Sequence, residues 1–410
     1  MLLAQLLKRM IKKGTLTVID ADGDCHVFEG TETGRTCTIR LHDRALHHKL
    51  FFRPELHVGE AYMNGTLTVE AGDIYEFAAL CGENMGWGDP DHWAPRLRRS
   101  IERAGRRIAQ FNPAHRARRN VAHHYDLSGK LYELFLDADR QYSCAYYLSP
   151  NDELETAQEQ KKRHIAAKLL LEPKQKVLDI GSGWGGLALS LAKTTEVDVT
   201  GITLSTEQHQ VANERARKEG MAERVRFGLQ DYRQVEGRFD RIVSVGMFEH
   251  VGVSHYDTYF RTLRNLLAED GVALLHTIGR AEGPNSTNPW IARYIFPGGY
   301  SPALSEVTRA IERAGLYITD IEVLRLHYAE TLRAWRRRFR QNRDQIRELY
   351  DERFCRMWEM YLAGSEVAFR YCGHVNFQIQ LARRQDAVPL SRDYISDFER
   401  AGPKAEWRAA

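Results

Sequence analysis

Residues 176–186, KVLDIGSGWGG, constrain the fold more than any other stretch of the chain. The letters VLDI form an apolar run of the kind expected for a parallel strand covered on both faces. Gly181 and Gly183 follow at once, and glycine permits positive φ and lets a ligand lie against the backbone. The run LALSLAK at 187–193 then predicts a helix. A strand, a glycine turn and a helix form the nucleotide-binding opening of a doubly wound α/β sheet.

The sequence around the same turn limits the class of ligand that could bind there. Gly181, Gly183 and Gly186 satisfy the dinucleotide spacing G-x-G-x-x-G. A dinucleotide site also needs an acidic residue about 20 positions on, but residues 201–204 are GITL. Asp179 lies inside the strand end, where a carboxylate can orient the turn and meet the positive end of S-adenosylmethionine. We therefore expect S-adenosylmethionine, and a turn without ligand is disfavoured because clustered glycines carry a conformational cost.

Strand and helix patterns alternate through the rest of the second half of the chain. We predict strands near 176–180, 197–202, 225–229, 239–245, 270–277, 316–324 and 374–382. We predict helices near 184–193, 205–219, 254–267 and 304–314, and a long helical insertion at 329–370. This order predicts an α/β fold, a Rossmann-like methyltransferase sheet with a helical lid insertion. Residues 121–410 are the expected catalytic domain.

Residues 1–95 are expected to form a small α+β domain associated with lipid or membrane. Short strands are predicted near 15–20, 25–30, 36–41 and 65–70, with helices near 42–50 and 73–81. The first 13 residues have a basic amphipathic pattern. Such a helix either docks on its own domain or lies on an anionic membrane surface.

An arginine-rich helical linker is predicted at 96–120. Nine arginines and one acid, Glu102, lie between Arg96 and Arg119, whereas the whole chain has a net charge of only +3. Each basic side chain near anionic headgroups contributes about 1 kcal/mol of attraction. Few aromatic residues are interleaved for base stacking, so an anionic lipid surface is favoured over nucleic acid.

Composition excludes several classes of protein. Hydrophobic residues make up 43% of the 410 positions and charged residues 28%, as in ordinary globular proteins. No apolar run reaches 18 residues, the N-terminus lacks a secretory signal, and the six cysteines show no C-x-x-C pairing. A reducing cytoplasm is therefore expected. No metal is expected, because the adjacent histidine pairs at 47–48 and 123–124 lack the one-face spacing of ligands.

Four further stretches could contribute chemistry. They contain Cys144 in YSCAYY, Glu249 in VGMFEHVG, His276 in ALLHTIGR and Tyr328 in RLHYAETLRAW. Two of them end predicted strands, and the carboxyl edge of an open sheet is where catalytic groups gather. On that edge His276 could face Glu249. A core cysteine, a buried ion pair and a structural histidine are the alternatives for the first three stretches.

Seven motifs occur in one order: HYDLS, YSCAYY, VLDIGSGWGG, GITLSTEQ, VGMFEHVG, YIFPGGY and YAETLRAW. With these motifs the chain resembles the bacterial cyclopropane-fatty-acyl-phospholipid synthases of the mycolic-acid cyclopropane synthase superfamily, over nearly its whole length. The resemblance implies transfer of a methylene from S-adenosylmethionine to a cis double bond of an acyl chain in a phospholipid. It also implies a carbocation that a bound bicarbonate ion deprotonates. One departure is Ser365, where many relatives have cysteine.

The resemblance also implies site residues, matched motif by motif. The implied catalytic and bicarbonate-binding residues are Cys144, Glu249, His276 and Tyr328, with the backbone of Ile278 contributing to the bicarbonate site. The implied cofactor-binding residues are Tyr142, Ser143, Gly181, Gly183, Thr203, Gln208 and Tyr232, together with Asp179. Thr203 and Gln208 would replace the usual ribose-binding acid by neutral hydrogen bonds.

The expected partners follow from the same reasoning. We expect a cytoplasmic enzyme held on the inner face of the cytoplasmic membrane, with an anionic bilayer as its surface and an unsaturated phospholipid as its substrate. A homodimer is left open, and no nucleic acid is expected. Three alternatives remain: a methyl- or methylene-branching enzyme of unsaturated lipids, a lipid-binding protein on a decayed methyltransferase fold, and an RNA methyltransferase suggested by the arginines at 96–119 and 333–343.

Overall fold

The computed structural model describes residues 2–85 and 129–401. The predicted linker at 96–120 and the HYDLS stretch lie outside the described residues. Contacts divide the chain into two compact units, which do not follow chain order. The first unit comprises Met1–Ile101, Ser286–Pro297 and Tyr328–His374; the second comprises Glu102–Asn285, Gly298–His327 and Val375–Ala410.

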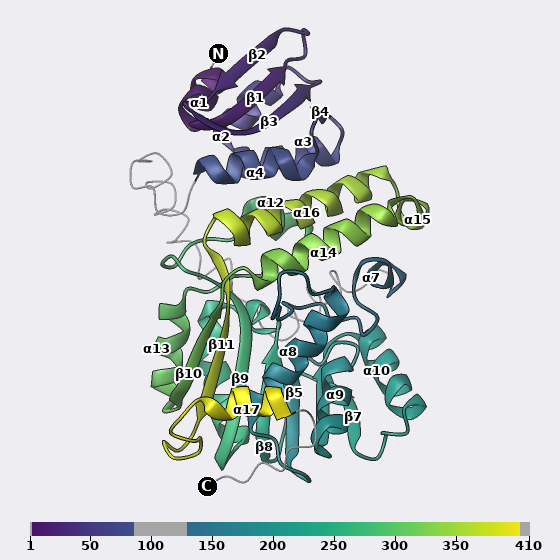
Figure 1. Ribbon diagram of the computed structural model, residues 1–410, viewed down its shortest axis with the longest axis vertical. Helices are drawn as coiled ribbons and strands as arrows, with labels where there is room; N and C mark the ends of the chain where they lie inside the picture. The colour runs from purple at the N-terminus through teal and green to yellow at the C-terminus, as the bar shows by residue number, and fades with distance from the viewer. Residues whose placement is uncertain (1, 86–128, 402–410) are drawn as a thin grey trace. The chain divides into compact units, whose positions relative to one another are not determined.

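The first unit begins with a four-stranded sheet of order β2-β1-β3-β4 (Figure 1). Its N-terminal elements are α1 (Leu2–Met10), β1 (Lys13–Ile19), β2 (Cys25–Glu29), β3 (Glu32–Leu41), α2 (Leu46–Phe52), α3 (Pro54–Met63), β4 (Leu67–Ala71) and α4 (Ile74–Met85). Its later elements are α12 (Pro289–Tyr294), α14 (His327–Gln341), α15 (Arg343–Leu349) and α16 (Glu352–Tyr371). The predicted strands and the helical nature of the insertion are confirmed, whereas α3 was not predicted.

One hydrophobic core joins these separate segments. Leu3 of α1 is buried in it, so the apolar side of the first helix packs on its own unit. Ala363 and Val367 of α16 lie in the same core as Leu80 of α4. This shared core is the reason why the insertion belongs to the first unit, although we expected it within a single segment at 121–410.

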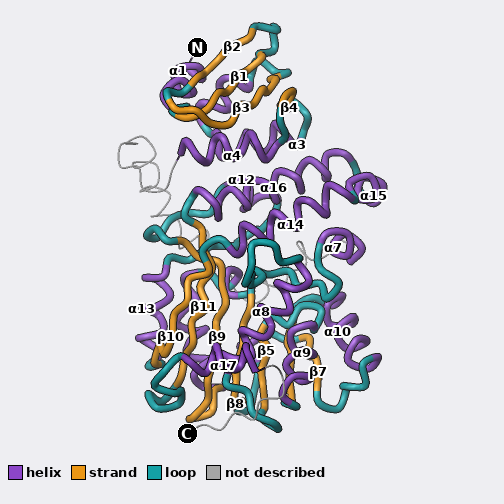
Figure 2. The backbone as a smooth tube through the Cα atoms, viewed as in Figure 1, coloured by secondary structure: helices purple, strands orange, loops and turns teal. Residues whose placement is uncertain are grey.

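The second unit contains a seven-stranded sheet of order β10-β11-β9-β8-β5-β6-β7 (Figure 2). Its strands are β5 (Lys176–Ile180), β6 (Asp198–Thr203), β7 (Val225–Leu229), β8 (Phe239–Val245), β9 (Leu267–Arg280), β10 (Tyr317–Leu324) and β11 (His374–Ala382). Its α-helices are α7 (Gly129–Phe135), α8 (Leu154–Leu169), α9 (Gly186–Thr195), α10 (Thr206–Lys218), α11 (Tyr256–Leu266), α13 (Leu304–Ala314) and α17 (Asp393–Ala401). All seven predicted strands are confirmed, and the fold is the expected Rossmann-like α/β sheet.

Two apolar cores cover the two faces of this sheet. On β5, Leu178 and Ile180 pack in the core that contains α11 and α13. Val177 packs in the other core, with residues of α8, α9, α10 and α17. Because successive strand residues point to opposite faces, Asp179 belongs to the face that α8 covers. The alternation on β5 thus decides which helix its acidic residue meets.

The sheet also fixes where a ligand can bind. The strand β5 pairs in parallel with β6 on one side and with β8 on the other. The chain therefore reverses its direction of travel across the sheet at β5, and a crevice opens beyond the carboxyl ends of strands at such a switch point.

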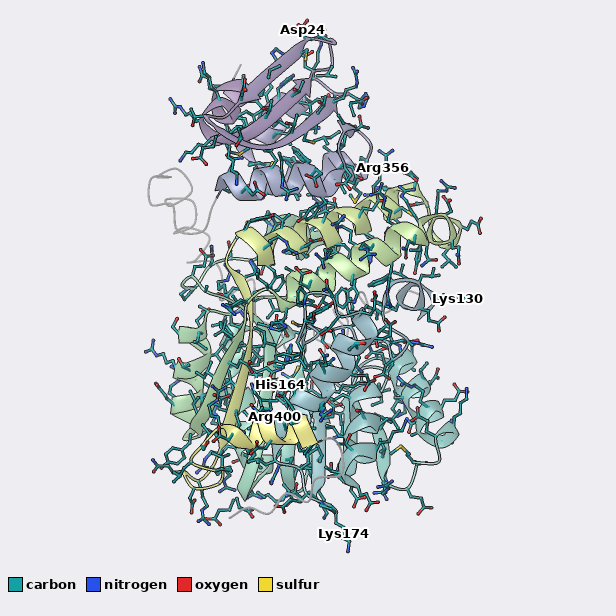
Figure 3. The ribbon with its side chains drawn as sticks, viewed as in Figure 1. Asp24, Lys130, His164, Lys174, Arg356 and Arg400 are labelled. Atoms are coloured by element: carbon teal, nitrogen blue, oxygen red, sulfur yellow. The ribbon has the colours of Figure 1, made fainter. Side chains whose placement is uncertain are left out.

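The helix α8, which we did not predict, buries polar side chains. His164, labelled in Figure 3, lies on this helix. Its ring contacts two carboxylates: Nδ1 lies 2.6 Å from Glu399 of α17 and Nε2 lies 2.7 Å from Glu322 of β10. The rings of Tyr146 and His164 stack 4.1 Å apart. Among the described helices, none is both long and apolar enough to cross a membrane.

Candidate active site

The predicted glycine turn connects β5 to α9. Gly181 has φ of 86° and Gly183 has φ of 54°, in the left-handed region that favours glycine. A β-carbon at Gly181 would lie 2.8 Å from the β-carbon of Met247, so the turn also approaches the segment after β8 closely. Gly185, which the sequence analysis did not single out, has φ of 85°.

Gly186 has a different role from the other glycines. A β-carbon there would lie 2.5 Å from Asp139 Oδ2 and from Gln141 Nε2. The absence of a side chain therefore lets the loop at 137–143 approach the start of α9. Asp137 shapes this loop, because its carboxylate accepts hydrogen bonds from the backbone N–H of Asp139 at 3.0 Å and of Gln141 at 2.9 Å.

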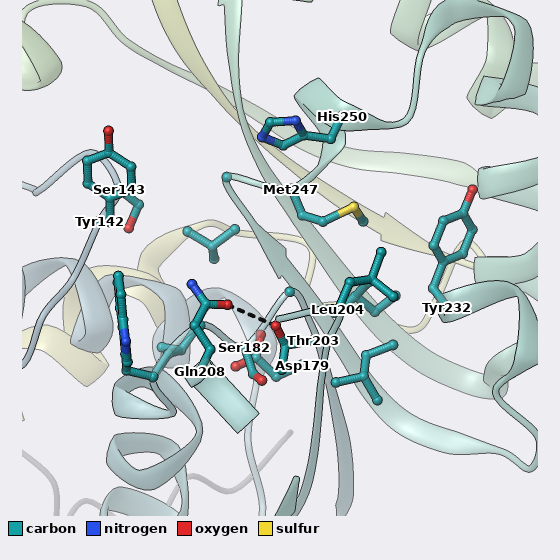
Figure 4. Close-up of a pocket in the computed structure, with 18 of the residues that line it drawn as sticks. Tyr142, Ser143, Asp179, Ser182, Thr203, Leu204, Gln208, Tyr232, Met247 and His250 are labelled. Atoms are coloured by element: carbon teal, nitrogen blue, oxygen red, sulfur yellow. Dashed lines mark hydrogen bonds between the residues drawn. The ribbon is translucent and has the colours of Figure 1, made fainter. Parts of the chain in front are cut away.

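A pocket lies beyond the carboxyl ends of β5, β6 and β8. All eight expected cofactor-binding residues line it: Tyr142, Ser143, Asp179, Gly181, Gly183, Thr203, Gln208 and Tyr232. Figure 4 shows Tyr142 and Ser143 on one side of the pocket and Tyr232 on the other. The hydroxyl of Thr203 donates to Gln208 Oε1 at 2.8 Å, so these two neutral side chains are already oriented together at the end of β6.

Asp179 is the acidic group at the bottom of the glycine turn. It is 1% exposed, and its Oδ2 accepts no hydrogen bond from the described residues. Burial raises the pKa of its carboxyl group to about 7, against the opposing effect of the Lys161 charge. An unsatisfied buried acceptor is costly. The carboxylate is therefore suited to meet a cation in the pocket, and the residues present fit S-adenosylmethionine.

Glu249 lies beside this pocket, directly before the lining residues His250 and Val251. Its Oε1 accepts a hydrogen bond from the backbone N–H of Ile278 at 2.5 Å. Its Oε2 is buried and has no partner among the described residues. Burial raises the pKa of this carboxyl group to about 7. The structure thus brings together two of the expected bicarbonate-site residues and leaves one carboxyl oxygen available.

His276 is 1% exposed and is held by two amides of β11. Its Nε2 lies 2.8 Å from Asn376 Nδ2, and its Nδ1 lies 3.1 Å from Gln378 Nε2. Burial lowers the pKa of His276 to about 3, so the ring is neutral. A neutral imidazole has one donor and one acceptor, so one of the amides presents its oxygen. Within the described chain no hydrogen bond joins Glu249 to this ring, so the expectation that the two face each other stays a prediction.

The remaining two expected residues are both buried. Cys144 is fully buried, and its Sγ donates to the carbonyl oxygen of Ala145 at 3.3 Å. Tyr328 belongs to the first compact unit, where its ring centroid lies 4.7 Å from that of Phe369 and 5.7 Å from that of Trp335. None of the six cysteines, all of which lie in the described residues, forms a disulfide.

Sequence reasoning missed the side chains that support the site from α8 and β11. Asn376, Gln378 and Gln380 alternate along β11, and each is at most 1% exposed. Their spacing of two on an otherwise apolar strand could have indicated a buried polar row. Lys161 and Gln158 of α8 are equally buried, but the surrounding sequence LETAQEQKKRH is too polar to suggest a buried helix face.

The sheet order, the glycine turn and the pocket at the switch point define an S-adenosylmethionine-dependent methyltransferase. The solved structure of a mycolic acid cyclopropane synthase bound to SAH and CTAB has this fold, with a TM-score of 0.62 and 32% identity, covering 66% of this chain and 99% of that one. The family model "Mycolic acid cyclopropane synthetase" matches residues 113–379. The chain belongs to this family.

Two curated relatives extend the match beyond the catalytic region. The cyclopropane-fatty-acyl-phospholipid synthase of Escherichia coli is 39% identical over 332 residues, which cover 81% of this chain and 84% of the relative. The tuberculostearic acid methyltransferase of Mycobacterium tuberculosis is 36% identical over 391 residues, which cover 89% of this chain and 87% of the relative. The family resemblance predicted from the seven motifs is confirmed.

Proposed function

We propose that this protein is a cyclopropane-fatty-acyl-phospholipid synthase. It would transfer a methylene from S-adenosylmethionine to the cis double bond of an unsaturated acyl chain in a membrane phospholipid. The observation that carries the proposal is the buried Glu249 carboxyl group, with one unpartnered oxygen, directly beside the pocket. The relative from Escherichia coli, whose name states this activity, supports the choice of substrate.

The pocket residues would bind and orient the cofactor. When bound, S-adenosylmethionine supplies an electrophilic methyl group. Gly181 and Gly183 would let it lie against the backbone, and the Thr203–Gln208 pair would hold its ribose by neutral hydrogen bonds. Asp179 would meet its positive charge. Because an alkene is a weak nucleophile, alignment of the double bond and exclusion of water must supply much of the rate.

The second set of residues would hold a bicarbonate ion, which would remove a proton from the substrate carbocation as the ring closes. A carboxyl group with a pKa raised to about 7 can be protonated near neutrality, and a neutral carboxyl group donates a hydrogen bond to an anion without repelling it. We assign this role to Glu249 Oε2. Cys144, His276, Tyr328 and the Ile278 backbone would complete the site, with neutral His276 fixed by its two amides.

Membrane association is a further part of the proposal. We propose that the N-terminal region 1–95 and the arginine-rich segment 96–120 hold the enzyme on the anionic inner face of the cytoplasmic membrane. The charge of the segment 96–120 supports this. The apolar side of α1 is used within its own unit, so its basic residues Lys8 and Arg9, rather than its apolar side, would contact the headgroups. A homodimer is compatible with this arrangement.

The test is a product analysis. The full-length protein is mixed with S-adenosylmethionine, bicarbonate and vesicles of a monounsaturated anionic phospholipid, and the acyl chains are analysed by mass spectrometry and proton NMR. We expect a gain of one methylene, loss of vinyl protons and new upfield ring protons, with lower turnover in bicarbonate-depleted buffer. Vesicles of saturated phospholipid are the control.

The same assay distinguishes cyclopropanation from a second candidate function, the formation of a branched acyl chain. The relative from Mycobacterium tuberculosis is named a tuberculostearic acid methyltransferase and favours a branching reaction. The same mass gain without ring protons would establish a methyl- or methylene-branched product and refute cyclopropanation. Unchanged lipid, with S-adenosylmethionine still bound, would refute both lipid reactions.

A further inference from the structure

The buried face of α8 contains an ammonium group that the proposed chemistry does not use. Lys161 is fully buried. Its Nζ donates to Gln141 Oε1 at 2.5 Å and to Ser143 Oγ at 2.9 Å. Both acceptors are neutral oxygens, and both residues line the cofactor pocket. Lysine is almost never fully buried unless it is paired, so this placement calls for a physical reason.

A second side chain of α8 also binds the loop at residues 141–143. The side-chain amide of Gln158 donates to the carbonyl oxygens of Gln141 at 3.2 Å and of Ser143 at 3.1 Å. Gln158 and Lys161 are one turn apart on α8, so together they fix both the backbone and the side chains of residues 141–143. This wall of the pocket is therefore positioned by α8.

The charge of Lys161 also acts on two buried carboxyl groups, Asp137 and Asp179, with which it forms no direct ion pair among the described residues. Asp179 lies on the face of β5 that α8 covers, as the alternation of Val177 and Leu178 between the two cores shows. The Lys161 charge lowers the pKa of Asp179, against the larger effect of burial. In turn, burial lowers the pKa of Lys161 to about 8, and the charge of Asp137 opposes this effect. A buried cation and a buried anion on facing elements stabilise each other's charged forms.

We propose that Lys161 is a positioning residue for S-adenosylmethionine binding, which holds the 141–143 wall and keeps Asp179 ionised opposite the positive charge of the cofactor. This inference rests on one part of the proposed function, namely that the pocket binds S-adenosylmethionine. It does not depend on bicarbonate, on the lipid or on the product.

Other charged or titratable groups also act on this pair. Asp139 and Lys162 act on Lys161 with opposite signs, and Cys144 is a further titratable neighbour. Lys161 in turn lowers the pKa of His276, after the larger effect of burial. Asp179 lines the pocket and is expected to lose its charge as pH falls below neutrality, because burial raises its pKa to about 7. Burial also raises the pKa of Glu249 to about 7, but Glu249 does not line the pocket. Binding of a cation should therefore weaken as pH falls.

The test is the dissociation constant of S-adenosylmethionine, measured without lipid by isothermal titration calorimetry between pH 6 and pH 8.5. For the wild-type protein we expect affinity to fall about tenfold from pH 8 to pH 6, as one carboxylate with a pKa near 7 is protonated. Lys161→Met should move the midpoint upward by about one unit and so weaken binding at pH 7.5 by at least about threefold. Lys161→Arg, which keeps the charge, should retain the wild-type midpoint.

Lys162→Met is the matched control. Lys162 is the next residue on α8 and is also buried, but it pairs directly with Asp139 at 2.8 Å. We expect this variant to keep the wild-type midpoint. Asp179→Asn tests the charge without altering Lys161, and its affinity should no longer vary with pH over this range.

Three results would overturn the proposal. They are an unchanged midpoint in Lys161→Met, even with weaker binding; the same upward shift in Lys162→Met; and a persistent pH dependence in Asp179→Asn. If Lys161→Met does not fold, the Asp179→Asn and Lys161→Arg titrations decide the question. A wild-type protein that binds no S-adenosylmethionine would refute the proposed function itself, whereas binding without lipid conversion would leave this inference standing.

Discussion

Replacement of Glu249 by glutamine should make the protein more stable at alkaline pH while it abolishes turnover. Glu249 is 8% exposed, and its Oε1 accepts a 2.5 Å hydrogen bond from the Ile278 N–H. Among the described residues no cation pairs with its carboxylate, and burial raises its pKa from 4.5 to about 7. Glutamine keeps the shape and an acceptor oxygen but cannot ionise.

The sign and size of the stability change follow from proton linkage. A folded-state pKa above the unfolded value favours the protonated native form, so the stability is fully present below pH 4.5 and is lost as pH rises through about 7. A shift of about 2.5 units corresponds to about 3 kcal/mol of unfolding free energy lost at pH 8. Glu249→Gln removes this loss, so its stability should exceed that of the wild type at pH 8 and approach it at pH 5.

The assay is urea denaturation at pH 5, 6.5 and 8, with lipid turnover and S-adenosylmethionine binding measured on the same samples. Turnover should fall at least about 100-fold, the usual contribution of a group that assists proton transfer. Binding should change little, because Glu249 does not line the cofactor pocket.

Glu366→Gln is the matched comparison in the first unit. Glu366 is also buried, with 1% exposure, but it accepts from Arg336 Nε at 3.0 Å and from Arg370 at 3.3 Å. The same substitution should therefore destabilise the protein at pH 8, by about 1–3 kcal/mol. If Glu249→Gln lost stability at pH 8 as Glu366→Gln is expected to, or if it kept wild-type turnover, the assignment of Glu249 as an uncompensated catalytic carboxyl group would be refuted.

Three further predictions concern the supports of the site. Gly186→Ala should weaken S-adenosylmethionine binding by at least about tenfold, a penalty of ~1.4 kcal/mol, because a β-carbon would lie 2.5 Å from the loop at 137–143; unchanged calorimetric affinity would contradict this. Gln378→Leu should lower turnover about tenfold or more with cofactor affinity unchanged, because His276 loses the amide that orients its ring; equal losses of both would show a general structural effect instead. Glu322→Gln should lower the unfolding free energy by about 1–3 kcal/mol at pH 7. Burial raises the pKa of Glu322, but its hydrogen bond from His164 and the charge of Lys168 outweigh burial and lower it well below its ordinary value of 4.5. In acid denaturation the difference from wild type should therefore begin to shrink as pH falls below 4.5 and disappear only at pH values far below that.

The sequence by itself determined the catalytic fold and the floor of the pocket. The parallel strands β5 to β9 appear as separate, largely apolar runs, because helices cover both faces of a parallel sheet. The glycines at 181 and 183 are visible because positive φ there leaves a local requirement in the sequence. Short-range rules were sufficient for these features. The full set of eight expected cofactor residues came from the family resemblance, and all eight line one pocket.

Tertiary structure alone decided which buried polar groups meet. The local sequence does not show that Asn376 and Gln378 contact His276, which lies about 100 positions away in the chain. These residues meet because β9 and β11 are adjacent strands in the sheet. The polar sequence of α8 conceals that Lys161 is buried against the pocket wall. Likewise, the insertion helices join the N-terminal core through apolar contacts at α16. Such pairings depend on which elements are adjacent in space, and the chain's own sequence spacing does not encode that adjacency.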